Sequence, residues 1–259
     1  DYLFISAPEN IAWLLNIRGY DNPNSPIPNA RLIINKNKKF FLITQKNNAK
    51  KIIKEKKINK NLVIDIRNIS KLINSLRGNK FIIDNKTCSI YHENIIKSKF
   101  KILDKDDPIY KLKSIKNLCE INHMIEAHKK DGLALTKFIY WIKNINKKTI
   151  TEVAAQNKLE KFRKLNTDYL FPSFNTIAGS GSNGAIVHYR ATTKATKIIK
   201  KKDVFLIDSG GQYRYGTTDV TRTICFSNQK LSIKNAYTNV LKGHIAVALT
   251  NLNKKKTGK

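Results

Sequence analysis

Short apolar runs alternate with helical patterns over the first hundred residues of the chain. Period-two or β-branched runs predict strands at residues 3–6, 30–35, 39–44, 61–67 and 80–84. Residues 8–15, 47–57, 70–76 and 89–96 have the pattern of helices, with a Pro/Asn-rich loop at 22–28. This order predicts an α/β (α+β) domain with a mixed sheet over residues 1–107.

A second domain is expected from residue 108, because Asp106, Asp107 and Pro108 interrupt the pattern. Apolar residues recur at helical spacing between 113 and 144, so we expect a long helix there. The stripe that predicts its buried face consists of Leu118, Ile121, Ile125 and Leu133, and Met124, Phe138 and Trp141 extend it. Further helices are expected at 149–165, which opens with T-I-T-E and resembles a capped start, and at 231–253, before a basic end at 254–259.

The composition is strongly basic, but it does not favour a nucleic-acid partner. The 259 residues carry a net charge of +30 and a sequence pI near 10.0. The excess of positive charge comes mostly from Lys residues scattered through every segment. Together with many Asn and Ile residues, this composition resembles that of proteins encoded by an AT-rich genome. Arg is the side chain that reads bases and grips phosphates in two-point contacts, and few Arg residues are present. We therefore expect no specific nucleic-acid binding.

Cysteine usage and hydropathy favour a cytoplasmic protein without a membrane partner. Cys88, Cys119 and Cys225 lie far apart and match no zinc spacing, which fits free thiols in a reducing compartment. No apolar run approaches the ~20 residues of a membrane span. No signal peptide is visible, although the chain begins at Asp1 without a Met, so a lost leader stays open.

The segment 203–226, DVFLIDSGGQYRYGTTDVTRTICF, carries the strongest chemical signal. Its apolar and β-branched runs around three glycines predict two antiparallel strands with a tight connection. A hairpin centred between Tyr213 and Arg214 places Asp208 directly opposite Asp219. Like charges that close need a shared proton, a cationic side chain or a metal ion, and paired carboxylates suit hard divalent ions. The alternative is a turn with two solvated acids.

Other candidate motifs are weaker. The run G-S-G-S-N-G at 179–184 matches a dinucleotide fingerprint, but a β-rich run follows it where a helix is required, so a hairpin turn is expected. His188 is expected on the strand after that turn. His123 and His128 are five residues apart, which is not the spacing of a zinc helix, and we expect them at the surface. His244 is expected to be structural.

The stretches FPSFNTIAGSGSNGAIVHYRAT (171–192), DVFLIDSGGQYRYGTTDVTRT (203–223) and VLKGHIAVAL (240–249) resemble the pita-bread metallopeptidases. That group includes creatinase, prolidase, methionine aminopeptidase and, most similar here, the long Xaa-Pro aminopeptidases. The resemblance covers nearly the whole chain. It implies a creatinase-type N-terminal domain with an RNase H-like fold over 1–107 and the first half of a pita-bread catalytic domain over 108–259.

The resemblance also implies roles for three residues. Asp208 matches the terminal and Asp219 the bridging carboxylate ligand of two divalent ions, for which Mn²⁺ is expected and Co²⁺ or Zn²⁺ are alternatives. His188 matches a catalytic histidine that contacts substrate beside the metals and helps with proton transfer. Phe174 stands where some relatives carry Tyr, so it receives no catalytic role.

The expected activity is release of the N-terminal residue from peptides with proline second, by a homodimeric enzyme. Alternatives are a prolidase, which cleaves dipeptides, and a non-enzymatic pita-bread binding module. Creatinase chemistry is not expected with both Asp present. The remaining family ligands are expected beyond residue 259, since no Glu follows Asp219 and the one later His is His244. The chain is therefore expected to be a fragment that is inactive by itself.

Overall fold

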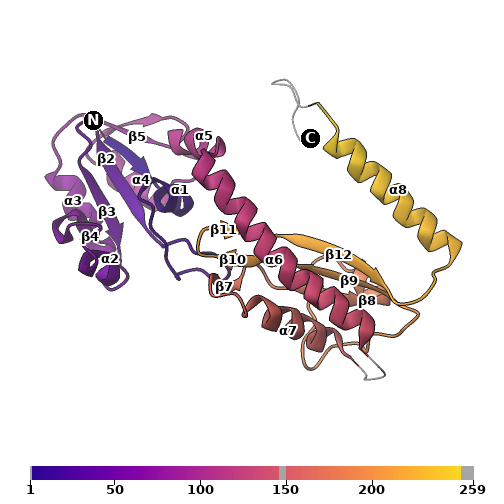
Figure 1. Ribbon diagram of the computed structural model, residues 1–259. Coiled ribbons are helices and arrows are strands. Elements are labelled where there is room, and N and C mark those ends of the chain that lie inside the picture. The colour runs from indigo at the N-terminus through magenta and orange to yellow at the C-terminus, as the bar shows by residue number, and fades with distance from the viewer. Residues whose placement is uncertain (1, 146–149, 252–259) are drawn as a thin grey trace. The chain divides into compact units, whose positions relative to one another are not determined.

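The computed structural model describes residues 2–145 and 150–251. The chain divides into two compact units, one of residues 1–129 with 212–218 and one of residues 130–211 with 219–259 (Figure 1). The start of the predicted helix at 149 and the predicted basic end at 254–259 lie outside the described residues.

A six-stranded mixed sheet organises the first unit, as the alternating pattern predicted. Its order is β4-β3-β2-β1-β5-β6, with antiparallel pairs β1–β2 and β2–β3 and parallel pairs β3–β4, β1–β5 and β5–β6. The strands are β1 (Tyr2–Ile5), β2 (Arg31–Asn35), β3 (Phe40–Thr44), β4 (Val63–Asp65), β5 (Lys80–Ile83) and β6 (Lys101–Asp104). Strand β6 was not predicted, because its K-I-L-D pattern is too short to stand out.

Helices cover both faces of this sheet, so the central strands are apolar on both sides. Neighbouring residues Phe4 and Ile5 of β1 belong to separate buried clusters, as do Leu32 and Ile33 of β2. One cluster includes α3 (Ile69–Ser75) and α4 (Ile90–Lys97), and the other α1 (Pro8–Leu14), α2 (Lys50–Lys54) and α5 (Pro108–Ser114). Two short 3-10 helices, η1 (Lys60–Leu62) and η2 (Ile66–Asn68), flank β4.

The long helix expected at 113–144 is two helices, and its predicted buried face is wrong. Helix α5 ends at Ser114, and α6 (Leu118–Asn144) follows. Leu118 and Leu133 of the predicted stripe are 78% and 58% exposed. Phe138, which was expected to extend that stripe, is buried, and so is Ile142. Both belong to the buried cluster of the second unit, whose contacts decide which face of α6 is covered.

The three cysteines differ in exposure, which predicts different reactivity. Cys88 is half-buried, and burial together with the nearby carboxylate of Glu93 raises the pKa of its thiol to about 11. Cys119 and Cys225 are exposed. Because the thiolate is the reactive form, a thiol reagent at mildly alkaline pH should label Cys119 and Cys225 quickly and Cys88 slowly, as measured by peptide mass spectrometry. Equal rates at all three would contradict this burial pattern.

The second unit contains an antiparallel sheet in the order β12-β9-β8, formed by β8 (Ile177–Ser180), β9 (Val204–Ser209) and β12 (Val220–Cys225). The end of α6 and α7 (Glu152–Arg163) share its buried cluster (Figure 1). Thr151 caps α7 by accepting from the backbone N–H of Ala154 at 3.1 Å, as the capped start predicted. The unit also includes β7 (Tyr169–Pro172), η3 (Gly181–Ala185) and α8 (Leu231–Ala248).

A two-residue turn, Arg214 and Tyr215, joins β10 (Gly211–Tyr213) to β11 (Gly216–Thr217). Gly216 is required directly after this turn, because a Cβ there would lie 2.8 Å from the Cβ of Ala127.

Among the helices that the structure describes, none has the length and apolar character of a membrane span.

Candidate metal centre

The two predicted metal ligands lie close together in the fold, but not in the predicted register. Asp208 pairs with Thr221, and Ser209 pairs with Val220, so Asp219 lies one residue before β12 and is not opposite Asp208. The prediction of directly opposed carboxylates is therefore wrong. Its physical reason is the position of the turn, since the paired strands are centred between Arg214 and Tyr215, one residue later than expected.

Asp208 lies on the face of β9 opposite the buried side chains, and the strand pattern predicts the same face for Asp219. Phe205, Ile207 and Ser209 of β9 are buried, and Asp208 between them is on the opposite face. Side chains alternate along a strand, and this alternation, continued to the residue before β12, predicts that Asp219 shares the face of Thr221, which pairs with Asp208. On that geometry Asp208 and Asp219 are diagonal neighbours, a relation that places Cβ atoms roughly 7 Å apart or less. That spacing suits two carboxylates that share a metal site.

Thr221 is a residue of this face that the sequence reasoning missed. Its Oγ1 donates to Oδ1 of Asp208 at 2.8 Å. Asp208 is half-buried, whereas Thr221 and Asp219 are exposed. A hydrogen bond to one carboxylate oxygen holds the carboxylate in one orientation, so its remaining lone pairs point in a defined direction. Hydrogen-bond partners of metal-binding carboxylates have this effect. The signal in the sequence was the D-V-T spacing, which places Thr two residues after Asp219.

A buried ion pair fixes the end of β9 from the covered side of the sheet. Arg163 of α7 donates to Asp131 of α6 through Nε at 2.6 Å and Nη2 at 3.1 Å, and through Nη2 to Oγ of Ser209 at 3.0 Å. Arg163 and Asp131 are 1% and 2% exposed. Since Ser209 follows Asp208 directly, its hydrogen bond to Arg163 restrains the chain beside Asp208.

His188 is not on a strand, contrary to the prediction. The glycine-rich run forms η3 instead of a hairpin turn, and His188 follows in an exposed turn with a φ of 55°. The run is structural, because a Cβ on Gly179 would lie 2.7 Å from Cα of Gly184. Close approach of these two backbones therefore explains the glycines without a dinucleotide. His123, His128 and His244 are exposed on helices.

The carboxylate pair fits part of a metal site and not a whole one. Across residues 2–145 and 150–251, no group of three or more His, Cys, Asp or Glu side chains is arranged to hold a metal ion. Hard divalent ions take about six oxygen ligands, and Asp208 with Asp219 supplies the negatively charged oxygens that such ions prefer. The two carboxylates therefore have the donor atoms that a hard divalent ion requires. Further ligands are needed to complete the coordination of the ion.

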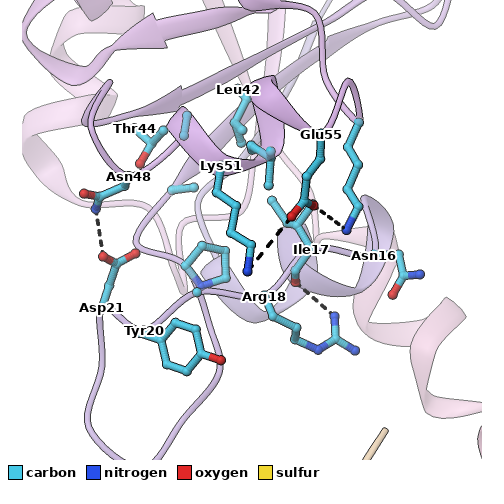
Figure 2. A pocket seen from close by; sticks show the side chains of 16 residues that line it. Asn16, Ile17, Arg18, Tyr20, Asp21, Leu42, Thr44, Asn48, Lys51 and Glu55 are labelled. Carbon is cyan, nitrogen blue, oxygen red and sulfur yellow. Dashed lines mark hydrogen bonds and ion pairs between the residues drawn. The ribbon is translucent and has the colours of Figure 1, made fainter. Parts of the chain in front are cut away.

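A cavity of about 460 Å³ in the first unit is lined by charged groups that pair among themselves (Figure 2). Asn48 Nδ2 donates to Oδ1 of Asp21 at 2.7 Å, and Glu55 lies 4.0 Å from Lys51 Nζ and 3.1 Å from Lys57 Nζ. The lining contains three cationic side chains and two carboxylates, and no His or Cys. We assign it no part in the chemistry.

Two sequence models show the family of this chain. The sequence model of metallopeptidase family M24 matches residues 122–258, and that of the creatinase/prolidase N-terminal domain matches residues 1–120. The chain belongs to metallopeptidase family M24.

Curated relatives point to one branch of this family. The chain is 33% identical to aminopeptidase P2 of Arabidopsis thaliana, over 95% of this chain and 39% of that protein. It is 35% identical to Xaa-Pro aminopeptidase ApepP of Drosophila melanogaster, over 96% of this chain and 42% of that protein. The chain therefore spans about two fifths of the length of these relatives.

Solved structures agree on the fold. The X-prolyl aminopeptidase of Caenorhabditis elegans, described as a cytosolic enzyme with a di-nuclear active site, has a TM-score of 0.81 and 25% identity, over 95% of this chain and 42% of that one. The Xaa-Pro dipeptidase of Bacillus anthracis has a TM-score of 0.72 at 20% identity, over 95% and 66% of the two chains.

The Thr221 hydrogen bond gives a test of the site that does not remove a ligand. Thr221→Val keeps the shape of the side chain but removes the donor to Asp208. In the complete gene product we expect roughly 10- to 100-fold weaker Mn²⁺ binding, measured by titration calorimetry. Thr223→Val, on the same face of β12, is the matched control and should leave affinity unchanged. Equal affinities for the Thr221 variant and the parent protein would contradict an orienting role.

Proposed function

We propose that this chain carries the two-aspartate part of a two-metal Xaa-Pro aminopeptidase, which releases the N-terminal residue from peptides with proline second. The observation that carries the proposal is that Asp208 of β9 pairs with Thr221 of β12, two residues after Asp219, in a member of family M24. The names of the curated relatives favour an aminopeptidase over a dipeptidase.

In this proposal each residue has a distinct task. Asp208 and Asp219 would hold the two ions, and Thr221 would keep Asp208 in orientation. The bound ions, expected to be Mn²⁺ with Co²⁺ or Zn²⁺ as alternatives, supply an activated water and polarise the scissile carbonyl. His188 contacts the carbonyl or the leaving nitrogen of the substrate and helps with proton transfer. The remaining ligands come from outside the residues that the structure describes.

The proposal extends to the organisation of the whole protein. We place the boundary between the creatinase-type and catalytic domains near residue 107, where Asp107 caps α5 by accepting from the backbone N–H of Ile109 at 2.9 Å. A homodimer and a cytoplasmic location are part of the same proposal, the latter supported by the description of the nematode relative.

A peptide panel separates the candidate functions. The complete gene product, loaded with Mn²⁺, is offered the tripeptide Ala-Pro-Ala, the dipeptide Ala-Pro and the control Ala-Ala-Ala. We expect release of the first residue from the proline tripeptide alone, loss of this activity with a chelator, and recovery with Mn²⁺. Cleavage of the dipeptide alone would favour a prolidase. Failure to cleave either proline peptide, with salt-dependent binding to RNA or DNA, would favour a binding module.

Residues 1–259 by themselves should bind metal weakly. Two carboxylates leave most of the roughly six ligand positions of each ion to water, which lowers affinity. We therefore expect weak Mn²⁺ binding without saturation at two ions, and no cleavage of Ala-Pro-Ala, in a titration followed by electron paramagnetic resonance. Tight binding of two ions with turnover would show that this chain contains a complete site.

A further inference from the structure

The carboxylate of Glu152 is fully buried and accepts hydrogen bonds from four different groups. Oε1 accepts from the backbone N–H of Ser180 at 2.7 Å and from Asn183 Nδ2 at 3.0 Å. Oε2 accepts from the hydroxyl of Tyr189 at 2.8 Å and from the backbone N–H of Lys197 at 2.9 Å. The exposed fraction of Glu152 is 0%. A carboxylate has about four acceptor positions, so this one is saturated.

These four donors are distributed along one segment, the connection between β8 and β9. Ser180 ends β8, Asn183 lies in η3, and Lys197 follows near the return to β9. The backbone N–H of Glu152 also donates to the carbonyl of Lys197 at 3.0 Å. The four donors to the carboxylate are neutral groups, and a buried charge that loses such donors is costly. Glu152 therefore holds the whole connection in one conformation.

His188 lies inside this connection and has a strained backbone. A left-handed φ of 55° is unfavourable for a non-glycine residue. Such a conformation persists where the surrounding structure over-determines it. The turn is closed by the Tyr189 backbone N–H, which donates to the carbonyl of Ile186 at 3.2 Å. The tyrosine hydroxyl is held at the same time by Glu152 and by Asn183 Nδ2, the latter at 2.7 Å.

We propose that Glu152 is a positioning residue for His188, acting through Tyr189 to fix the left-handed turn that presents the imidazole to substrate. The inference rests on the catalytic role proposed for His188. Glu152 has no contact with His188 itself among the hydrogen bonds of the described residues, so its effect must pass along the chain. The path is short, since Tyr189 follows His188 directly.

The ionisation of Tyr189 is consistent with this role. Burial and the hydrogen bond to Glu152 raise the pKa of the Tyr189 hydroxyl to about 12. The hydroxyl therefore remains a proton donor to Glu152 across the range in which peptidases are assayed. A phenolate would instead repel the carboxylate and release the turn.

The test uses Tyr189→Phe, because Glu152→Gln would set an amide N–H against backbone donors and could prevent folding. Tyr189→Phe removes one oxygen and keeps the ring. The matched control is Tyr169→Phe, since the Tyr169 hydroxyl donates to Glu160 of the same helix α7 at 2.6 Å, outside the connection. Each change is made in the complete gene product with His188 intact and with His188→Ala.

We expect Tyr189→Phe to lower kcat for Ala-Pro-Ala roughly 10- to 100-fold, with KM changed less than about twofold, because a small misplacement of a catalytic group acts on the chemical step. Amide hydrogen exchange over residues 181–197 should become faster. In the His188→Ala background the same change should lower kcat no further, since the residue through which it acts is gone. Tyr169→Phe should change neither kcat nor this exchange.

Two results would overturn the inference. One is an equal loss of kcat from Tyr189→Phe in both backgrounds, which would show an effect independent of His188. The other is faster exchange with unchanged kcat, which would leave Glu152 a purely structural residue. A normal kcat for His188→Ala would be a third and distinguishable result. It would refute the proposed catalytic role of His188, and with it the positioning role of Glu152 that depends on it.

Discussion

Asp219→Asn in the complete gene product should abolish both metal binding and peptidase turnover while leaving the fold intact. Asn keeps the size of the side chain but removes the charge and one of the two anionic oxygens that a bridging ligand needs. Asp219 is exposed and precedes β12, so its replacement should change the free energy of unfolding by no more than about 0.5 kcal/mol. Metal content by elemental analysis, turnover of Ala-Pro-Ala and thermal unfolding are measured together.

Asp106→Asn is a suitable control for the loss of one negative charge. The Asp106 side chain is 81% exposed and pairs with Lys86, whose side chain is 78% exposed, so this contact contributes little. It should leave metal content and turnover unchanged. Near-normal turnover of Asp219→Asn without restored metal binding would contradict the assignment of Asp219, and unfolding of the variant would contradict its exposed position.

His188→Ala should lower kcat by roughly 10²–10⁴-fold, the usual contribution of a group that assists proton transfer. Metal content should stay unchanged, because the proposed role of His188 is contact with the substrate and not with the metal ions. Alanine also relieves little of the backbone strain at φ 55°, so stability should change only slightly. Steady-state kinetics and elemental analysis of the same preparation separate these effects.

His244→Ala is the matched control for His188→Ala, since His244 is exposed on α8. It should retain the kcat of the parent protein. Loss of one metal ion per subunit in His188→Ala would instead identify His188 as a ligand. An unchanged kcat with full metal content would remove His188 from the mechanism.

Much of the fold was predictable because local patterns and packing agree. In the first unit, neighbouring residues such as Leu32 and Ile33 are both buried, and runs of this kind predict strands covered on both faces. The face of α6 was not predictable in the same way. Its sequence carries two apolar stripes, and only contact with the β8–β9–β12 sheet decides that Phe138 is buried and Leu133 is exposed.

Asp208 and Asp219 remain predicted metal ligands, but the predicted geometry of the site was wrong. Asp219 is not opposite Asp208, because the register depends on a turn one residue later than the symmetry of the sequence suggested. The location of His188 was missed because Ile186 and Val187 have strand propensity, whereas the hydrogen bonds of Glu152 and Asn183 impose a turn. Long-range polar contacts of this kind leave no periodic signal in a sequence.

The most direct test of the central claim is anomalous diffraction at the manganese absorption edge from crystals of the complete gene product grown with Mn²⁺. The account predicts two anomalous peaks on the open face of the β9–β12 pair, one in contact with Asp208 and both in contact with Asp219. Peaks that touch neither carboxylate, or a single peak at another group of residues, would contradict it.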